Sequence, residues 1–347
     1  MPFSLLIRVC ASINEHSNKK VMFPRCTRLV QHRSTLLRPP RVISSQNFRT
    51  DACATSSKRC IRHQFSTSTP DEDGDFREFK DRLRPLGPGR VDLALDDRSG
   101  LATLVLDNHE RRNALSGTMM VQLSDAVNEL EQWDRGVALV VHGMRGNFCA
   151  GADLSLAREH LRTGADGRSM CALMSDTLTR LRRLPLISVA AVDGAAIGGG
   201  AELATSCDFR VAGPESNIRF VQVKMGVSTG WGGGARLVGL VGRRAALRLL
   251  AWSPPLAADE AVALGLVDAV AEEKGGALAA AREFLGGVLT QDAHEAVRAV
   301  KRVVAAADVP VSERLHRAEA DEFSALWGGA HNRMALESPS SPRPPRS

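Results

Sequence analysis

Two turns rich in glycine and alanine, each directly after an apolar run typical of a β-strand, constrain this 347-residue chain more than any other feature. The first is FCAGADL at residues 148–154, and the second lies within ISVAAVDGAAIGGGAELATSCDFR at 187–210. Small residues let backbone N–H groups approach a ligand closely. If the two turns meet, their N–H groups can form an oxyanion hole, which stabilises a thioester carbonyl as it becomes an enolate.

The spacing of apolar residues predicts strands and helices around these turns. Strands are expected at 91–95, 101–107, 137–142, 187–192, 209–211 and 218–221, the first two as a hairpin. Helices are expected at 76–83, 116–133, 170–184, from about 199, and at 293–306, with a mostly helical remainder from 231 to 327. Repeated strand, turn and helix units predict an α/β domain that holds its ligand at the strand ends.

Residues 1–70 differ in composition from the rest of the chain. They contain twelve Lys and Arg residues against two acidic residues, so residues 71–347 carry −4 although the whole chain carries +6. An Arg-rich, Ser/Thr-rich and acid-poor leader is typical of a mitochondrial transit peptide; a disordered N-terminus is the alternative. The apolar run at 3–7 is too short for a secretory signal, and no run reaches the ~18 residues of a membrane helix. We therefore expect no membrane partner.

Cysteine and histidine spacing argues against a metal site. Four of the seven cysteines lie in the leader, which leaves Cys149, Cys171 and Cys207 without paired metal-ligand spacing. The nine histidines contain no H-x-x-x-H pair. We expect reduced, buried thiols and no bound metal.

Three motifs in a fixed order carry a family resemblance. They are N-x-x-x-x-N-A-L at 108–115, A-G-A-D-L at 150–154 and G-G-G-A-E-L at 198–203, with S-C-D-F-R following at 206–210. From about 91 to 336 the chain resembles the enoyl-CoA hydratase/isomerase (crotonase) superfamily. The resemblance implies an α/β spiral of ββα units with a C-terminal helical region that helps form a homotrimer or hexamer. The domain is expected at 71–347, with its core at 91–270, helical region at 271–336 and a disordered tail at 337–347.

The same resemblance assigns roles to individual residues. It places the backbone N–H groups of Ala152 and Gly199 on the thioester oxygen of an acyl-CoA substrate, and the positive end of the helix that starts at Gly199 also favours the developing charge. Glu202 lies one turn further along that helix and can return to the same pocket. The remaining substrate-binding candidates are Ala150, Asp153, Leu154, Gly198 and Trp231.

Each of these residues also has a structural interpretation. The glycines at 198–200 can serve close helix–strand packing alone, and Glu202 can satisfy a buried helix end. Asp153 is expected to cap the following helix, and Trp231 can be ordinary core.

Gln222 indicates which reaction the site can catalyse. Hydratases of the family use two glutamates to handle water, and the second of these positions is Gln222 here, which cannot act as a general base. Decarboxylation needs only the oxyanion hole and a proton, which Glu202 can supply, while Gln222 can hydrogen-bond the departing carboxylate. One branch of the family resembles this chain in four further segments, 178–190, 214–221, 230–233 and 327–329. The resemblance to this branch implies decarboxylation of ethylmalonyl-CoA, and of methylmalonyl-CoA as a smaller relative. It also implies a role in metabolite repair and no cofactor.

Two other functions stay open. One is another activity of the family on an acyl-CoA, such as that of an isomerase, hydratase or thioester hydrolase. The other is RNA binding, which the −4 charge of 71–347 and the 4% aromatic content disfavour, so no nucleic-acid partner is expected. The family resemblance implies the cytosol and the leader implies the mitochondrial matrix.

Overall fold

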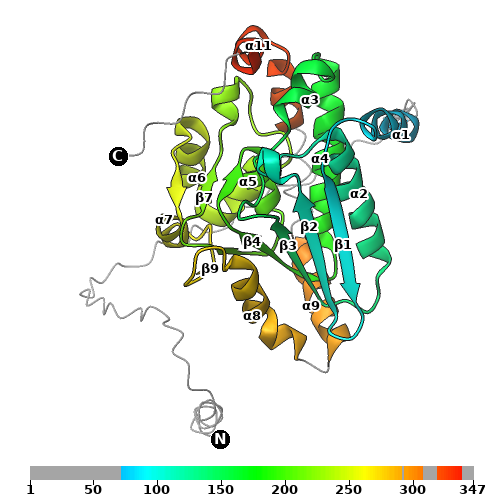
Figure 1. Ribbon diagram of the computed structural model, residues 1–347, viewed down its shortest axis with the longest axis vertical. Helices are drawn as coiled ribbons and strands as arrows, with labels where there is room; N and C mark the ends of the chain where they lie inside the picture. The colour runs from blue at the N-terminus through cyan, green and yellow to red at the C-terminus, as the bar shows by residue number, and fades with distance from the viewer. Residues whose placement is uncertain (1–71, 291–292, 308–318, 338–347) are drawn as a thin grey trace, which may run out of the picture. The chain divides into compact units, whose positions relative to one another are not determined.

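The computed structural model describes residues 72–290, 293–307 and 319–337, all of which lie in one compact unit, Thr67–Ser347 (Figure 1). The expected leader at 1–70 and all but the first residue of the expected tail at 337–347 lie outside the described residues. In these described stretches no helix is long and apolar enough to cross a membrane, and no group of three or more His, Cys, Asp or Glu side chains is arranged to hold a metal ion.

A six-stranded sheet runs through the described part of the chain in the order β1-β2-β3-β4-β6-β9. Its strands are β1 (Arg90–Asp96), β2 (Leu101–Asp107), β3 (Ala138–Gly143), β4 (Ile187–Val192), β6 (Phe209–Ala212) and β9 (Ala269–Val270). The first pair is the predicted antiparallel hairpin, and all other neighbours are parallel. A second sheet, in the order β5-β7-β8, comprises β5 (Ala195–Ile197), β7 (Asn217–Arg219) and β8 (Leu256–Ala257).

Helices cover both faces of the large sheet, because alternate residues of its central strands point to opposite sides. Val140 of β3 and Val189 of β4 pack with Leu285 of α8 (Ala277–Leu289), whereas Val141 belongs to the core cluster that also contains Leu178 of α4 (Gly164–Arg183). The other helices on the α4 side, α1 (Glu72–Leu83) and α2 (Gly117–Gln132), contact α4 (Figure 1).

The remaining helices come after the glycine-rich turns: α3 follows the first turn, and the others begin at or after the second. They are α3 (Leu154–Glu159), α5 (Gly199–Ala204), α6 (Gly233–Trp252), α7 (Ala258–Ala263), α9 (His294–Ala307) and α11 (Ala330–Glu337), with residues 319–326 also helical. Two short 3-10 helices, η1 (His109–Arg111) and η2 (Gln222–Met225), complete the set of labelled elements.

The structure differs from the sequence prediction at four places. Helix α1 starts at Glu72, four residues before the predicted start at 76. Helix α4 starts six residues before the predicted start, because Thr163 and Asp166 form a reciprocal capping box. Strand β7 ends at Arg219 rather than 221, since the chain turns there into η2. The strands β5, β8 and β9 were not predicted, and each is only two or three residues long.

The order of the strands brings the two glycine-rich turns together. Strands β3 and β4 are parallel neighbours, so the turns that follow them leave the same edge of the sheet. Two isolated bridges then join these segments to their surroundings: Cys149 pairs with Ala196 of β5, and Leu115 pairs with Ala152. The fold thus places the first turn directly against the start of α5.

Candidate active site

The two turns lie in close contact at the start of α5. A Cβ atom on Gly151 would lie 2.7 Å from the carbonyl oxygen of Ile197 and 3.1 Å from the amide nitrogen of Gly199. The backbone N–H of Leu115 donates to the Gly151 carbonyl (2.7 Å), and the Leu115 carbonyl accepts from the Asp153 N–H (2.9 Å). The N–H of Ala152, between these two residues, takes part in neither hydrogen bond. The Gly199 N–H has no acceptor within α5, because it belongs to the first turn of the helix.

Glycine is required at two adjacent positions here, for different reasons. Gly198 has φ 56° and ψ −118°, a conformation that a side chain disfavours. At Gly199 the limit is space, since a Cβ atom would overlap the ring of Trp231. Trp231 is only 3% exposed, so its ring cannot move aside into solvent.

Asn113 holds the first turn in shape. Its side-chain amide donates to the carbonyls of Met144 (2.9 Å) and Asn147 (2.7 Å), and its oxygen accepts from the backbone N–H of Asn108 (2.9 Å). Asn108 in turn donates to the Ala114 carbonyl at 2.7 Å. The two asparagines of the N-x-x-x-x-N-A-L motif therefore organise the backbone around the turn.

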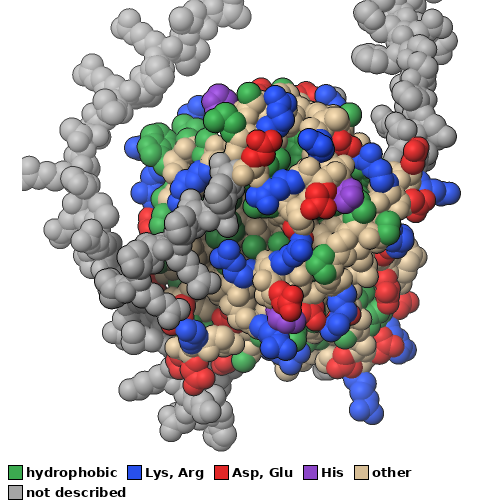
Figure 2. Space-filling view, turned by 45° about the horizontal axis from the view of Figure 1, so that its top comes forward, with side chains coloured by type: hydrophobic (Ala, Val, Ile, Leu, Met, Phe, Trp, Pro, Cys, Tyr) green, Lys and Arg blue, Asp and Glu red, His purple; other side chains and the backbone are tan. Residues whose placement is uncertain are grey.

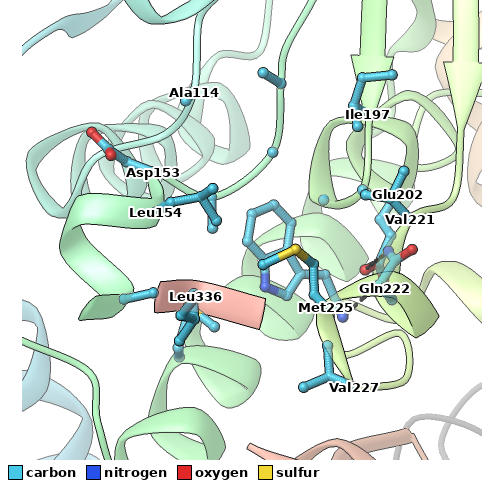
Figure 3. A pocket seen from close by; sticks show the side chains of 18 of the residues that line it. Ala114, Asp153, Leu154, Ile197, Glu202, Val221, Gln222, Met225, Val227 and Leu336 are labelled. Carbon is cyan, nitrogen blue, oxygen red and sulfur yellow. Dashed lines mark hydrogen bonds between the residues drawn. The ribbon is translucent and has the colours of Figure 1, made fainter. Parts of the chain in front are cut away.

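Both turns line a cavity of about 690 Å³. All nine site candidates from the sequence line it: Ala150, Ala152, Asp153, Leu154, Gly198, Gly199, Glu202, Gln222 and Trp231. Figure 3 shows Glu202 beside Gln222 on one side of the cavity, with Asp153 and Leu154 across from them. Leu336 of α11 closes part of the cavity from the C-terminal end of the chain (Figure 3).

The Glu202 carboxylate is buried and accepts three N–H donors. Its Oε1 accepts from Nε2 of Gln222 at 2.8 Å, and its Oε2 accepts from the backbone N–H groups of Trp231 (2.9 Å) and Gly233 (2.8 Å). Burial raises the pKa of Glu202 above its ordinary value, while the charge of Arg236 and these hydrogen bonds oppose the rise. A carboxyl group of this kind can hold a proton at a higher pH than an exposed glutamate.

Three charged residues in or near the site have defined partners, and Asp153 has the capping role predicted from the sequence. Asp153 caps α3, because its carboxylate accepts from the Ser155 N–H at 2.9 Å. Arg111, which lines the cavity, forms an ion pair with Asp153. Lys301 lies outside the cavity lining and forms a partly buried ion pair with Asp208.

A family profile described as enoyl-CoA hydratase/isomerase matches residues 96–340. The chain belongs to this family. It is 42% identical over 267 residues to a protein named ethylmalonyl-CoA decarboxylase from Gallus gallus, covering 76% of this chain and 88% of that protein. It is 39% identical over 285 residues to the protein of the same name from Homo sapiens, covering 81% and 92%.

Solved structures agree with the enoyl-CoA hydratase/isomerase fold. A crystal structure of an enoyl-CoA hydratase/isomerase from Mycobacterium paratuberculosis superposes with a TM-score of 0.66 at 20% identity, covering 72% of this chain and 98% of that chain. The predicted family and fold class are therefore confirmed. The individual roles of the cavity residues remain predictions.

The family motifs did not reveal the C-terminal side of the site. Phe323, Trp327 and Asn332 also line the cavity, and Phe323 stacks on Trp327 with ring centroids 5.0 Å apart. The signal that could have found them is the spacing of Glu319, Phe323 and Trp327 at four residues, which places one carboxylate on an otherwise apolar helix face.

Proposed function

We propose that this protein decarboxylates ethylmalonyl-CoA to butyryl-CoA, and methylmalonyl-CoA to propionyl-CoA. The observation that carries the proposal is the pairing of two glycine-rich turns beside a site that contains one glutamate and one glutamine. Relatives at about 40% identity that bear the name of this activity support it. Removal of such side products of acyl-CoA carboxylation would be a metabolite-repair role.

The chemistry follows from the cavity residues. The N–H groups of Ala152 and Gly199 receive the thioester oxygen, and the C–C bond to the substrate carboxylate breaks, leaving its electron pair in the enolate. CO₂ departs, and a proton from Glu202 completes the acyl-CoA product at the α-carbon. In this proposal the second amide hydrogen of Gln222 contacts the carboxylate before it leaves, and Trp231 excludes water. No step requires a cofactor.

The direct test is CO₂ release by the purified full-length protein. We expect ethylmalonyl-CoA to yield CO₂ and butyryl-CoA in equal amounts, methylmalonyl-CoA to react more slowly, and crotonyl-CoA not to be hydrated. Chromatography of the CoA esters together with trapped CO₂ measures all three. If none of ethylmalonyl-CoA, methylmalonyl-CoA and malonyl-CoA releases CO₂, the proposal is wrong, and isomerase and thioester hydrolase assays become the next experiments.

Gln222→Glu tests why this site would not hydrate a double bond. It places a second carboxyl group where Nε2 now lies 2.8 Å from Glu202, so the pair shares a proton and one pKa rises. We expect decarboxylation to fall about ten-fold and crotonyl-CoA hydration to become measurable. Gln132→Glu, on an exposed position of α2, is the matched control. A wild-type protein that already hydrates crotonyl-CoA as fast as it decarboxylates would contradict this assignment.

RNA binding has less support. On the face in Figure 2, Lys and Arg side chains of the described residues are interspersed with Asp and Glu rather than forming a continuous basic stripe. A salt-sensitive RNA shift would favour that alternative.

The proposal includes the family's homotrimer or hexamer. The apolar side chains of Val300, Val303 and Val304 on α9 are 62%, 73% and 61% exposed, which is consistent with burial of this C-terminal helix between subunits. Light scattering of the purified protein measures the assembly.

A further inference from the structure

A second glutamate, Glu319, lies behind the cavity and outside the family motifs. It comes from the helical residues 319–326, and its Oε1 accepts from the backbone N–H of Ala235 at 2.5 Å. Ala235 belongs to the first turn of α6, the same turn whose Gly233 N–H donates to Glu202. Two carboxylates from distant parts of the chain therefore share one helix N-terminus, which favours negative charge.

Arg236 is the positive charge close to both carboxylates, and its own hydrogen bonds go to backbone carbonyls and a hydroxyl. Its Nη2 donates to the carbonyls of Glu202 (3.1 Å) and Trp231 (2.7 Å), and its Nε donates to Thr205 at 3.2 Å. With both glutamates ionised, this buried cluster carries two negative charges against one positive charge. A net buried charge is costly, so a proton on one carboxyl group would relieve it.

The pairing of the side chains indicates which carboxyl group takes the proton. Both oxygens of Glu202 accept N–H donors, whereas Oε2 of Glu319 is buried without a hydrogen-bond partner. Donors to both oxygens favour the ionised form of Glu202, and the unpartnered oxygen of Glu319 has room for a proton. The N–H groups around the cluster thus stabilise a negative charge on Glu202 more than on Glu319. The two carboxyl groups titrate as a pair, so the single proton resides mainly on Glu319, and Glu202 donates it from the minor form in which Glu202 is protonated.

Packing fixes Glu319 in this position. Phe323, one turn further along the same helix, packs so closely on Gly230 that a Cβ atom there would lie 2.5 Å from its ring. Trp327 follows one turn later, and its indole N–H donates to the Leu161 carbonyl at 2.9 Å. The turn that presents the Trp231 and Gly233 N–H groups to Glu202 is therefore held from behind by this helix.

We propose that Glu319 is a positioning residue for Glu202: it holds the first turn of α6 in place and, through its charge, sets the pH range over which Glu202 acts. This inference rests on the proposed function, in which Glu202 supplies the proton. The charged or titratable groups that face Glu319 are Glu202 from α5, Arg236 from α6 and the Cys171 thiol from α4.

The charge of Glu319 has a consequence for stability that needs no substrate. Burial, together with the neighbouring Glu202, raises the pKa of Glu319 from 4.5 to about 7. Between these two pH values the folded protein keeps a proton that the unfolded chain has lost, so stability falls as the pH rises from about 4.5 to about 7. Glu319→Gln keeps an acceptor for Ala235 and removes this titration.

The experiment compares thermal unfolding of the full-length wild type, Glu319→Gln, Glu202→Gln and the double variant from pH 5 to 8. We expect the wild type to lose about 3 °C more than Glu319→Gln over this range. In the Glu202→Gln background the effect of Glu319→Gln should be smaller, because the neighbouring charge is gone. Glu322→Gln, an exposed position on the same helix, should follow the wild type. Parallel curves for wild type and Glu319→Gln, or an equal effect in both backgrounds, would overturn the proposal.

The activity readout tests the link to Glu202. We expect Glu319→Gln to shift the alkaline limb of the kcat/KM profile for ethylmalonyl-CoA by about 0.5–1 pH unit to lower pH, because the second carboxyl group, which raises the pKa at which the pair loses its last proton, is removed. Glu322→Gln should leave the profile in place. An unshifted profile in an active Glu319→Gln protein would also overturn the proposal. If the wild type releases no CO₂, the proposed function fails. The thermal unfolding of the two single variants and the double variant then decides alone whether Glu319 and Glu202 are coupled.

Discussion

Gly199→Ala is expected to lower kcat/KM for ethylmalonyl-CoA decarboxylation about 10²–10³-fold, the usual effect of losing one oxyanion-hole donor. The new methyl group overlaps the buried Trp231 ring, which cannot move aside into solvent, so the start of α5 must move. This movement displaces the Gly199 N–H from the position proposed for the thioester oxygen. The loss should lie in kcat more than in KM, because the donor is worth most to the enolate.

Gly286→Ala is the matched control for this variant. A Cβ atom on Gly286 meets nothing within 4 Å, and the residue lies in α8, away from the cavity. We expect wild-type activity from Gly286→Ala, and a thermal unfolding midpoint at or above that of the wild type. Full activity of a folded Gly199→Ala protein would show that the N–H group of Gly199 does not stabilise the reaction.

The elements that position the two turns could be predicted from local sequence. The run at 137–142 predicts a strand buried on both faces, and β3 has that character because Val140 and Val141 face opposite helical layers. Ser116 predicts the start of α2 and caps it, accepting from the Met119 N–H. Such signals work because strand burial and helix capping depend on residues that are close in sequence.

The environment of Glu202 could not be predicted in the same way. Its position in α5 follows from the G-G-G-A-E-L motif, but its N–H donors come from Gln222, Trp231 and Gly233, which only the folded chain brings near. Glu319 is further still in sequence, and the spacing of Glu319, Phe323 and Trp327 shows a carboxylate on an apolar helix face without showing which residues it contacts. A buried charge cluster depends on tertiary contacts that periodicity does not encode.

Glu202→Gln separates the role of the charge from the role of the shape. A glutamine can keep the three hydrogen bonds if its oxygen accepts from Trp231 and Gly233 and its amide donates to a flipped Gln222, whose Oε1 is buried without a partner. The fold should therefore survive while the proton donor is lost. We expect kcat to fall about 10²–10⁴-fold, the typical contribution of a general acid or base.

The products of Glu202→Gln reveal the step that is affected. If Glu202 protonates the enolate, hydrogen from the solvent enters the α-carbon of butyryl-CoA with low stereoselectivity in the variant, whereas the wild type adds deuterium from D₂O to one face. Mass spectrometry and NMR of the product measure both. A Glu202→Gln protein that keeps wild-type kcat and stereoselectivity would show that the carboxylate serves only to satisfy the N–H groups of the 231–233 turn. That outcome would leave the oxyanion hole as the principal catalytic device of the site, since Ala152 and Gly199 do not depend on the charge of Glu202.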